Sequence, residues 1–246
     1  MKPASYIAAH VRRLLGDGGS APHSKEVQRF FKEEIQSRGW YTAELRKVAG
    51  RVRRAVLRDQ SLDYLVQVAD SLFRGRVLEE KVFAVFLLEK SVADFGSREF
   101  KLFASWLDRI GSWADHDALV HYLIGPMVLR EPRRAASVFR WAKSKRRWRR
   151  RAAAVALIRG AREQRFVSEI ESLAAQLLGD EDDMVQKGLG WLLREMTKAS
   201  RKAALPLLMS IRDRAPRLVL RTACETLPGP MRAKVLGKHD RRAVRN

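Results

Sequence analysis

The sequence lacks the features that mark secreted and membrane proteins. It has one cysteine, Cys224, in 246 residues, which excludes an internal disulfide and a cysteine-ligated zinc cluster. The apolar runs at 82–88 and 152–158 stop at seven residues, whereas a membrane-spanning helix needs about 20. The N-terminal segment carries arginines where a signal peptide has its apolar centre. We therefore predict a protein of the reducing cytoplasm, with no membrane span.

Acidic residues are also scarce. The chain has 28 Asp and Glu against 49 Lys and Arg, a net charge of +21. This excess predicts a polyanionic partner. Hydrophobic residues make up 46% of the chain, enough for a sizeable core, which excludes a disordered basic tail.

Alternating apolar and polar runs, which are typical of strands, are nearly absent, so we predict an all-α fold. About twelve helices, paired into roughly six units of about 40 residues, suit a HEAT- or armadillo-like solenoid. A compact helical domain without repeats stays open as the alternative. We expect one domain at 1–227 and a flexible basic tail at 228–246. Predicted helix stops lie at Gly16 to Pro22, Gly39, Gly50, Gly75, Gly96, Gly111, Pro132, Gly160, Gly179, Ala199 with Ser200, Pro216 and Pro228.

A helix predicted from residue 180 separates an apolar face from a basic one. Its first turn holds four acidic residues, which complement the helix dipole. The apolar stripe consists of Val185, Leu189, Leu192, Leu193 and Met196. The opposite side presents Lys187, Trp191, Arg194 and Lys198. A tryptophan at helical spacing usually packs in a core, but this stripe is already filled, so Trp191 is predicted to face a ligand.

A second informative helix follows Gly111. Its core face is predicted to be Leu119, Val120, Leu123, Ile124 and Met127. Asp117 lies on the flank of that face, one turn after Trp113. The run Asp115-His116-Asp117 is not expected to bind a metal, because adjacent helical side chains point in different directions and no second ligand motif accompanies them.

The densest charge lies at 143–151, where seven of nine residues are basic. Its predicted DNA-contacting residues are Arg146, Arg147, Trp148, Arg149, Arg150 and Arg151. Further arginines flank the block: Arg133, Arg134, Arg140, Arg159, Arg162 and Arg165. On stacked helices such arginines would align and match a regular phosphate spacing. A solvated turn or a localisation signal is the simpler alternative. Nucleic acid is favoured over a membrane or an acidic protein.

Three segments carry a resemblance to a known family. SWADHDALVHYLIGPMVLREP (112–132), WRRRAA (148–153) and VQKGLGWLLREMTK (185–198) resemble the DNA alkylation repair glycosylases built from HEAT-like repeats, the AlkD-like family. Weaker similarity runs from about residue 25, through RGWYTAELR (38–46), to about residue 226. The tryptophan followed four residues later by aspartate, together with the QK-GW-L-RE pattern, is specific only in combination.

The resemblance implies a right-handed superhelix of helix pairs that cradles duplex DNA and excises purines alkylated at N3 or N7. It assigns sugar-facing roles to Trp113 and Trp191, the catalytic carboxylate to Asp117, and a phosphate contact to Arg151. The intervening Ala114, Asp115 and His116 depart from the expected pattern. The implied enzyme is a monofunctional glycosylase that acts as a monomer without a cofactor or metal. The alternatives are an inactive binder of damaged or branched DNA, and a scaffold for an acidic protein or RNA.

Overall fold

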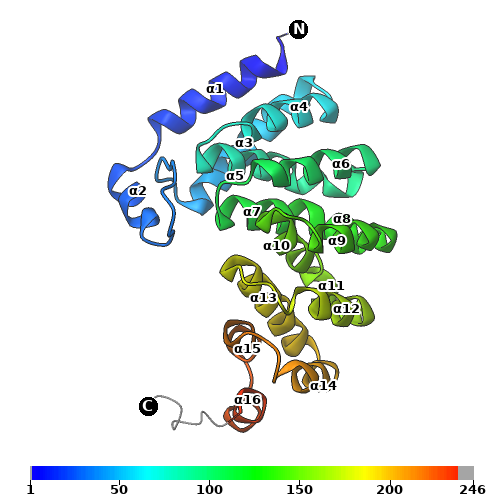
Figure 1. The fold of residues 1–246 in the computed structure, drawn as a ribbon. Coiled ribbons are helices and arrows are strands. Elements are labelled where there is room, and N and C mark those ends of the chain that lie inside the picture. The colour runs from blue at the N-terminus through cyan, green and yellow to red at the C-terminus, as the bar shows by residue number, and fades with distance from the viewer. Residues whose placement is uncertain (1, 238–246) are drawn as a thin grey trace. The chain divides into compact units, whose positions relative to one another are not determined.

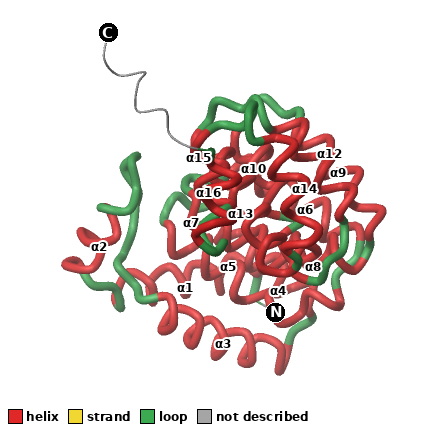
Figure 2. Tube along the Cα trace, turned by 90° about the horizontal axis from the view of Figure 1, so that it is seen from below, coloured by secondary structure: helices red, strands yellow, loops and turns green. Residues whose placement is uncertain are grey.

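The computed structural model describes residues 2–237, which are helical almost throughout (Figure 1). Loops join the helices, and the described residues form no strand beyond one isolated bridge between Gln36 and Val77 (Figure 2). The all-α prediction is therefore confirmed. No helix within 2–237 combines the length and the apolar character needed to cross a membrane.

The chain divides into two compact units, Met1–Met127 and Val128–Asn246. In the first unit, α3, α5 and α7 pack in succession, and α4 packs against α1, α3 and α5. Helix α5 is its centre, because Phe83, Leu87 and Leu88 are fully buried. The elements are α1 (Ala4–Asp17), α2 (Ala21–Gln28), α3 (Thr42–Asp59), α4 (Leu62–Phe73), α5 (Leu78–Leu88), η1 (Glu89–Asp94), α6 (Ser97–Trp106), η2 (Leu107–Arg109), α7 (Trp113–Leu119) and the π-helical turn η3 (Val120–Ile124).

The chain passes between the units within α8 (Gly125–Arg130). The second unit has two layers, one of α10, α13 and α15 and the other of α9, α12 and α14. Ala152, Ala153 and Ala154 of α10 are fully buried, and such small side chains let helices approach closely. The elements are η4 (Pro132–Arg134), α9 (Ala135–Ala142), α10 (Arg147–Val155), α11 (Ile158–Arg162), α12 (Val167–Leu177), α13 (Asp183–Ala199), α14 (Arg201–Ile211), α15 (Arg217–Ala223) and α16 (Gly229–Leu236). These stacked helix pairs confirm the HEAT-like prediction.

Several predicted boundaries are wrong. Gly50 and Gly160 lie inside α3 and α11 rather than ending helices, because a glycine in a helix costs only about 1 kcal/mol and packing outweighs it. The helices are also more numerous than twelve, since turns such as 156–157 divide longer stretches.

The predicted tail also begins too early. Residues 229–236 form α16, which packs against α14 and α15 with Val235 buried. The rest of the predicted tail, 238–246, lies outside the described residues.

Candidate functional site

A buried carboxylate fixes the start of α7. Oδ1 of Asp115 accepts hydrogen bonds from the backbone nitrogen and Oγ of Ser112 at 2.7 and 2.6 Å. Oδ2 accepts from the backbone nitrogen of Gly111 at 2.9 Å and pairs with Nζ of Lys81 at 3.3 Å. Both partners of this ion pair are buried. Asp115 is thus an anchor that ties the first turn of α7 to α5.

The next two residues contact each other. Nδ1 of His116 lies 2.6 Å from Oδ1 of Asp117. The His116 side chain is fully buried, whereas that of Asp117 is 18% exposed. The expectation that adjacent side chains in this run point in different directions is therefore wrong for this pair, because the contact between Nδ1 and Oδ1 brings the two side chains together. The structure nevertheless gives no group of three or more potential metal ligands within 2–237.

Trp113 lies at the first position of α7, one turn before Asp117. It is 36% exposed, and its ring stacks on Phe31 with centroids 4.9 Å apart and planes 13° apart. The predicted core face of this helix is confirmed, since Leu119, Val120, Leu123, Ile124 and Met127 are all fully buried. The helix therefore directs its apolar residues inward and leaves Trp113 and Asp117 accessible.

Helix α13 has the two faces that the sequence predicts. All five residues of the apolar stripe are buried. Lys187, Trp191 and Arg194 are half-buried, and Lys198 is exposed. The helix starts at Asp183 rather than at residue 180, because Asp182 is the N-cap and accepts from the backbone nitrogens of Met184 and Val185 at 2.9 and 3.3 Å. Only Asp183 of the four acidic residues lies in the first turn.

The basic face of α13 is organised around a buried acid that sequence reasoning missed. Glu195 pairs with Arg162 at 2.8 Å, Lys198 at 3.3 Å and Arg194 at 3.6 Å. Burial by itself raises the pKa of the Glu195 carboxyl, but the hydrogen bonds from Arg162 and Lys198 outweigh burial, so the pKa lies below its ordinary value. Arg194 also pairs with Glu225. The i+4 spacing of Glu195 from Trp191 is the signal that could have placed Glu195 beside this face.

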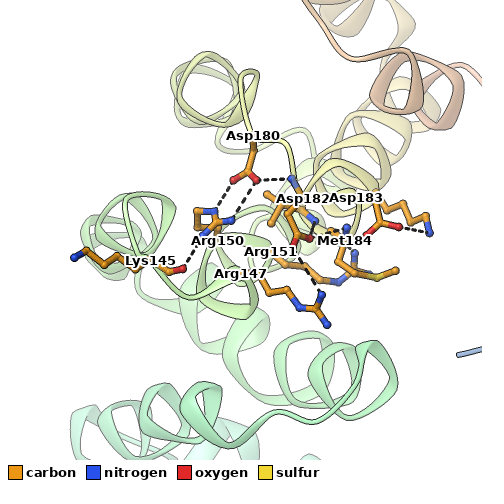
Figure 3. Close-up of polar contacts among 10 residues, drawn as sticks. Lys145, Arg147, Arg150, Arg151, Asp180, Asp182, Asp183 and Met184 are labelled. Atoms are coloured by element: carbon orange, nitrogen blue, oxygen red, sulfur yellow. Dashed lines mark hydrogen bonds and ion pairs between the residues drawn. The ribbon is translucent and has the colours of Figure 1, made fainter. Parts of the chain in front are cut away.

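The basic block begins α10 and is held partly by acids that precede α13 (Figure 3). Nε of Arg150 binds Asp180 at 2.5 Å, and its Nη1 donates to the carbonyl oxygens of Ser144 and Lys145, both at 3.0 Å. Arg147 lies 3.8 Å from Asp182, with its guanidinium over the ring of Trp148. These bonds give Arg150 a structural role, and its predicted phosphate contact stays a prediction.

The members of the block differ in exposure. Arg146 is exposed, and Arg147, Trp148 and Arg149 are half-buried. Arg151 is only 5% exposed, and its Nη1 donates to the carbonyl oxygen of Met184 at 2.6 Å (Figure 3). The phosphate contact that the resemblance assigns to Arg151 stays a prediction.

Two glycines in the QKGLGW segment allow close packing of α13 against its neighbouring helices. A Cβ at Gly188 would lie 3.1 Å from Cγ of Arg151, and a Cβ at Gly190 would lie 2.6 Å from Cβ of Thr222 in α15. Gly188 therefore accommodates the side chain from α10, and Gly190 allows the close approach of α13 and α15. Sequence reasoning assigned no role to either glycine.

The expected alignment of arginines is wrong for at least one flanking residue. Arg134 is only 6% exposed and pairs with Glu131 at 3.2 Å, while Arg133 is 81% exposed. These two adjacent arginines thus have different surroundings, because Arg134 is packed in the interior and Arg133 lies on the surface.

The stacked helix pairs define a helical-repeat protein, and its net charge of +21 makes it strongly basic. A family profile described as "DNA alkylation repair enzyme" matches residues 11–227, so the chain belongs to the DNA alkylation repair enzyme family. The family's name implies an enzyme that acts on DNA.

A solved structure supports the fold. A "Predicted DNA alkylation repair enzyme from Enterococcus faecalis" superposes with a TM-score of 0.76 at 16% sequence identity, over 86% of this chain and 97% of that one. At this identity the similarity supports the fold alone. A comparison with curated proteins gives no match.

Proposed function

We propose that this protein is a monofunctional DNA glycosylase that hydrolyses the N-glycosidic bond of cationic N3- or N7-alkylated purines in duplex DNA. One observation carries the proposal: Trp113 and Asp117 are accessible one turn apart on α7, with exposed fractions of 36% and 18%, while the two polar residues between them, Asp115 and His116, are buried. A carboxylate and an aromatic ring thus lie together on one helix.

The chemistry of the substrate fits these two groups. A purine alkylated at N3 or N7 carries a positive charge, so it leaves the sugar as a neutral base and needs no general acid. The charge that develops is on the sugar, which becomes oxocarbenium-like. An ionised carboxylate stabilises this cation by charge, and a tryptophan face does so by cation–π attraction.

The proposed steps need only residues of this chain. Asp117 stabilises the developing cation and orients the water that attacks C1′, while Trp113 contacts the sugar. The sugar-facing role of Trp191 stays a prediction. The bond from C1′ to the base nitrogen breaks and its electron pair leaves with the neutral base. The water oxygen bonds to C1′ as its proton passes to Asp117 and from there to solvent. No amine nucleophile is assigned, so the strand is expected to stay intact at the abasic site.

Basic side chains supply the proposed affinity for the duplex. Arg146, Arg147, Trp148 and Arg149 on α10 and Lys187, Arg194 and Lys198 on α13 are the proposed contacts, together with Arg151. Such contacts are largely independent of sequence, so selectivity would come from the lability of cationic bases rather than from base readout. The monomeric state and the cytoplasmic location stay predictions.

Release of free 7-methylguanine from methylated duplex DNA tests the proposal. We expect release that requires the protein and leaves an abasic site, with no base released from the same duplex before methylation. Salt-dependent binding without base release would instead identify an inactive DNA binder. An absence of both binding and release would favour a scaffold for another partner.

A further inference from the structure

His116 is a buried polar residue to which the proposed mechanism gives no task. Its side chain has no solvent exposure, and its Nδ1 lies 2.6 Å from Oδ1 of Asp117. A buried imidazole must have partners for its polar atoms to offset desolvation. Here one partner is the carboxylate that we propose as catalytic.

The direction of this hydrogen bond follows from the chemistry of the two groups. An ionised carboxylate can only accept, so Nδ1 of His116 must carry the proton and donate it. A donor that contacts a charged acceptor forms a shorter and stronger bond than two neutral groups do. The bond is thus made to the ionised form of Asp117, which is the form that the proposed mechanism requires.

The position of His116 is fixed from the residue before it. Asp115 binds the backbone of Gly111 and Ser112 and pairs with the buried Lys81. The first turn of α7 is therefore held against α5. The His116 imidazole follows directly on this turn, so it cannot move away without disrupting the turn. Asp115 thus anchors the turn that positions the His116 ring, and this ring in turn positions the Asp117 carboxylate.

We propose that His116 is a positioning residue that fixes Asp117 for glycosidic bond cleavage. The inference rests on the proposed function, because Asp117 must be the carboxylate that stabilises the sugar cation. An electrostatic stabiliser is effective when it is already oriented before the reaction. Loss of the His116 bond is therefore expected to lower the rate of base release without changing affinity for DNA.

Three substitutions separate the hydrogen bond from the packing of the ring. His116→Asn places an amide nitrogen near the position of Nδ1, His116→Gln places it near that of Nε2, and His116→Leu fills space without a donor. Partners that orient functional groups in metal sites typically contribute about 10- to 100-fold. We expect a similar loss of single-turnover rate in the Leu and Gln variants, restoration to within about threefold in the Asn variant, and unchanged DNA affinity in all three.

A measurement on the free protein tests the hydrogen bond between His116 and Asp117 without relying on activity. The Nδ1 proton of His116 should give a downfield resonance in the NMR spectrum of the wild type, and Asp117→Ala should remove or shift it strongly. A resonance insensitive to Asp117→Ala would overturn the inference, as would equal rates in the Leu and Asn variants. If the wild type releases no base, the proposed function fails and the positioning role fails with it. Activity in the wild type that His116→Leu leaves intact would overturn the positioning role alone.

Discussion

The two helices that carry the proposed sugar-facing tryptophans are stabilised in different ways. Helix α7 begins at the Asp115–Lys81 ion pair, whose side chains are 2% and 6% exposed. Helix α13 begins among partly exposed pairs, such as Lys187 with Asp183 at 3.5 Å, whose side chains are 42% and 35% exposed. Buried charges are screened much less by salt than exposed ones. The carboxylate helix is therefore expected to be rigid and insensitive to salt, and the basic helix to exchange its partners readily.

The strongest test of this contrast removes one acid from each helix. Asp115→Ala leaves the Lys81 ammonium buried without its carboxylate and should cost about 3 to 5 kcal/mol of unfolding free energy. Asp183→Ala breaks an exposed pair and should cost within about 1 kcal/mol. Urea denaturation of both variants measures the difference. Equal costs would show that the two helices are held alike.

The next effect concerns the carboxylate that the rigid helix presents. Asp117→Asn keeps the shape of the side chain and removes its charge, so base release should fall by roughly 10² to 10³-fold while DNA binding stays nearly intact. Single-turnover kinetics on methylated duplex DNA provide the measurement. Asp183→Asn is the matched control, and a rate for Asp117→Asn within about threefold of wild type would exclude Asp117 from the mechanism.

A smaller effect is expected from the tryptophan of the basic helix. Trp191 is half-buried and lies off the apolar stripe, so Trp191→Ala should melt within a few degrees of wild type and excise at least about tenfold more slowly, a loss of about 1.4 kcal/mol of transition-state stabilisation. Trp106 is fully buried and stacks on Phe73, so Trp106→Ala is the control that should cost about 3 to 5 kcal/mol of stability. Normal excision by Trp191→Ala would contradict its sugar-facing role.

The smallest effect distinguishes arginines within the basic block. Arg146→Ala and Arg149→Ala should each flatten the dependence of log K on log salt by about 0.9 if each residue contacts one phosphate. Arg150→Ala should leave that slope nearly unchanged and lower the melting temperature, because Arg150 binds Asp180 and two backbone carbonyls. Titrations with unmodified duplex DNA at several salt concentrations measure the slopes. Equal slopes in all three variants would contradict this division.

The sequence predicted most of the fold and the faces of the two informative helices. Apolar periodicity is a local property, and all ten residues that it assigned to the core, five after Gly111 and five on α13, are buried. It did not predict which charges would be buried. Arg151 and Glu195 are buried beside Met184 and Arg162, which lie on other helices and more than 30 residues away in the chain, and a linear pattern does not contain those distances.

The polar run on α7 shows that sequence spacing does not predict side-chain contacts even between adjacent residues. From spacing alone, Asp115, His116 and Asp117 looked like three side chains with separate directions. The contact between His116 and Asp117 depends on the side-chain rotamers of the two residues, which the spacing does not specify. The roles of Asp115 as anchor and His116 as donor became visible only once the buried surroundings of the turn were known.

The two glycines of α13 affect how relatives of this protein should be sorted. Gly188 and Gly190 serve the packing of α10 and α15 against α13, so a chain that has lost catalysis but kept this architecture would still need them. A search pattern built on QKGLGW would thus collect proteins of this shape, whatever they do to DNA. To identify the active proteins among them, the search would also have to include the positions equivalent to Trp113 and Asp117. At those positions the side chains themselves are proposed to take part in the reaction, whereas the glycines serve packing.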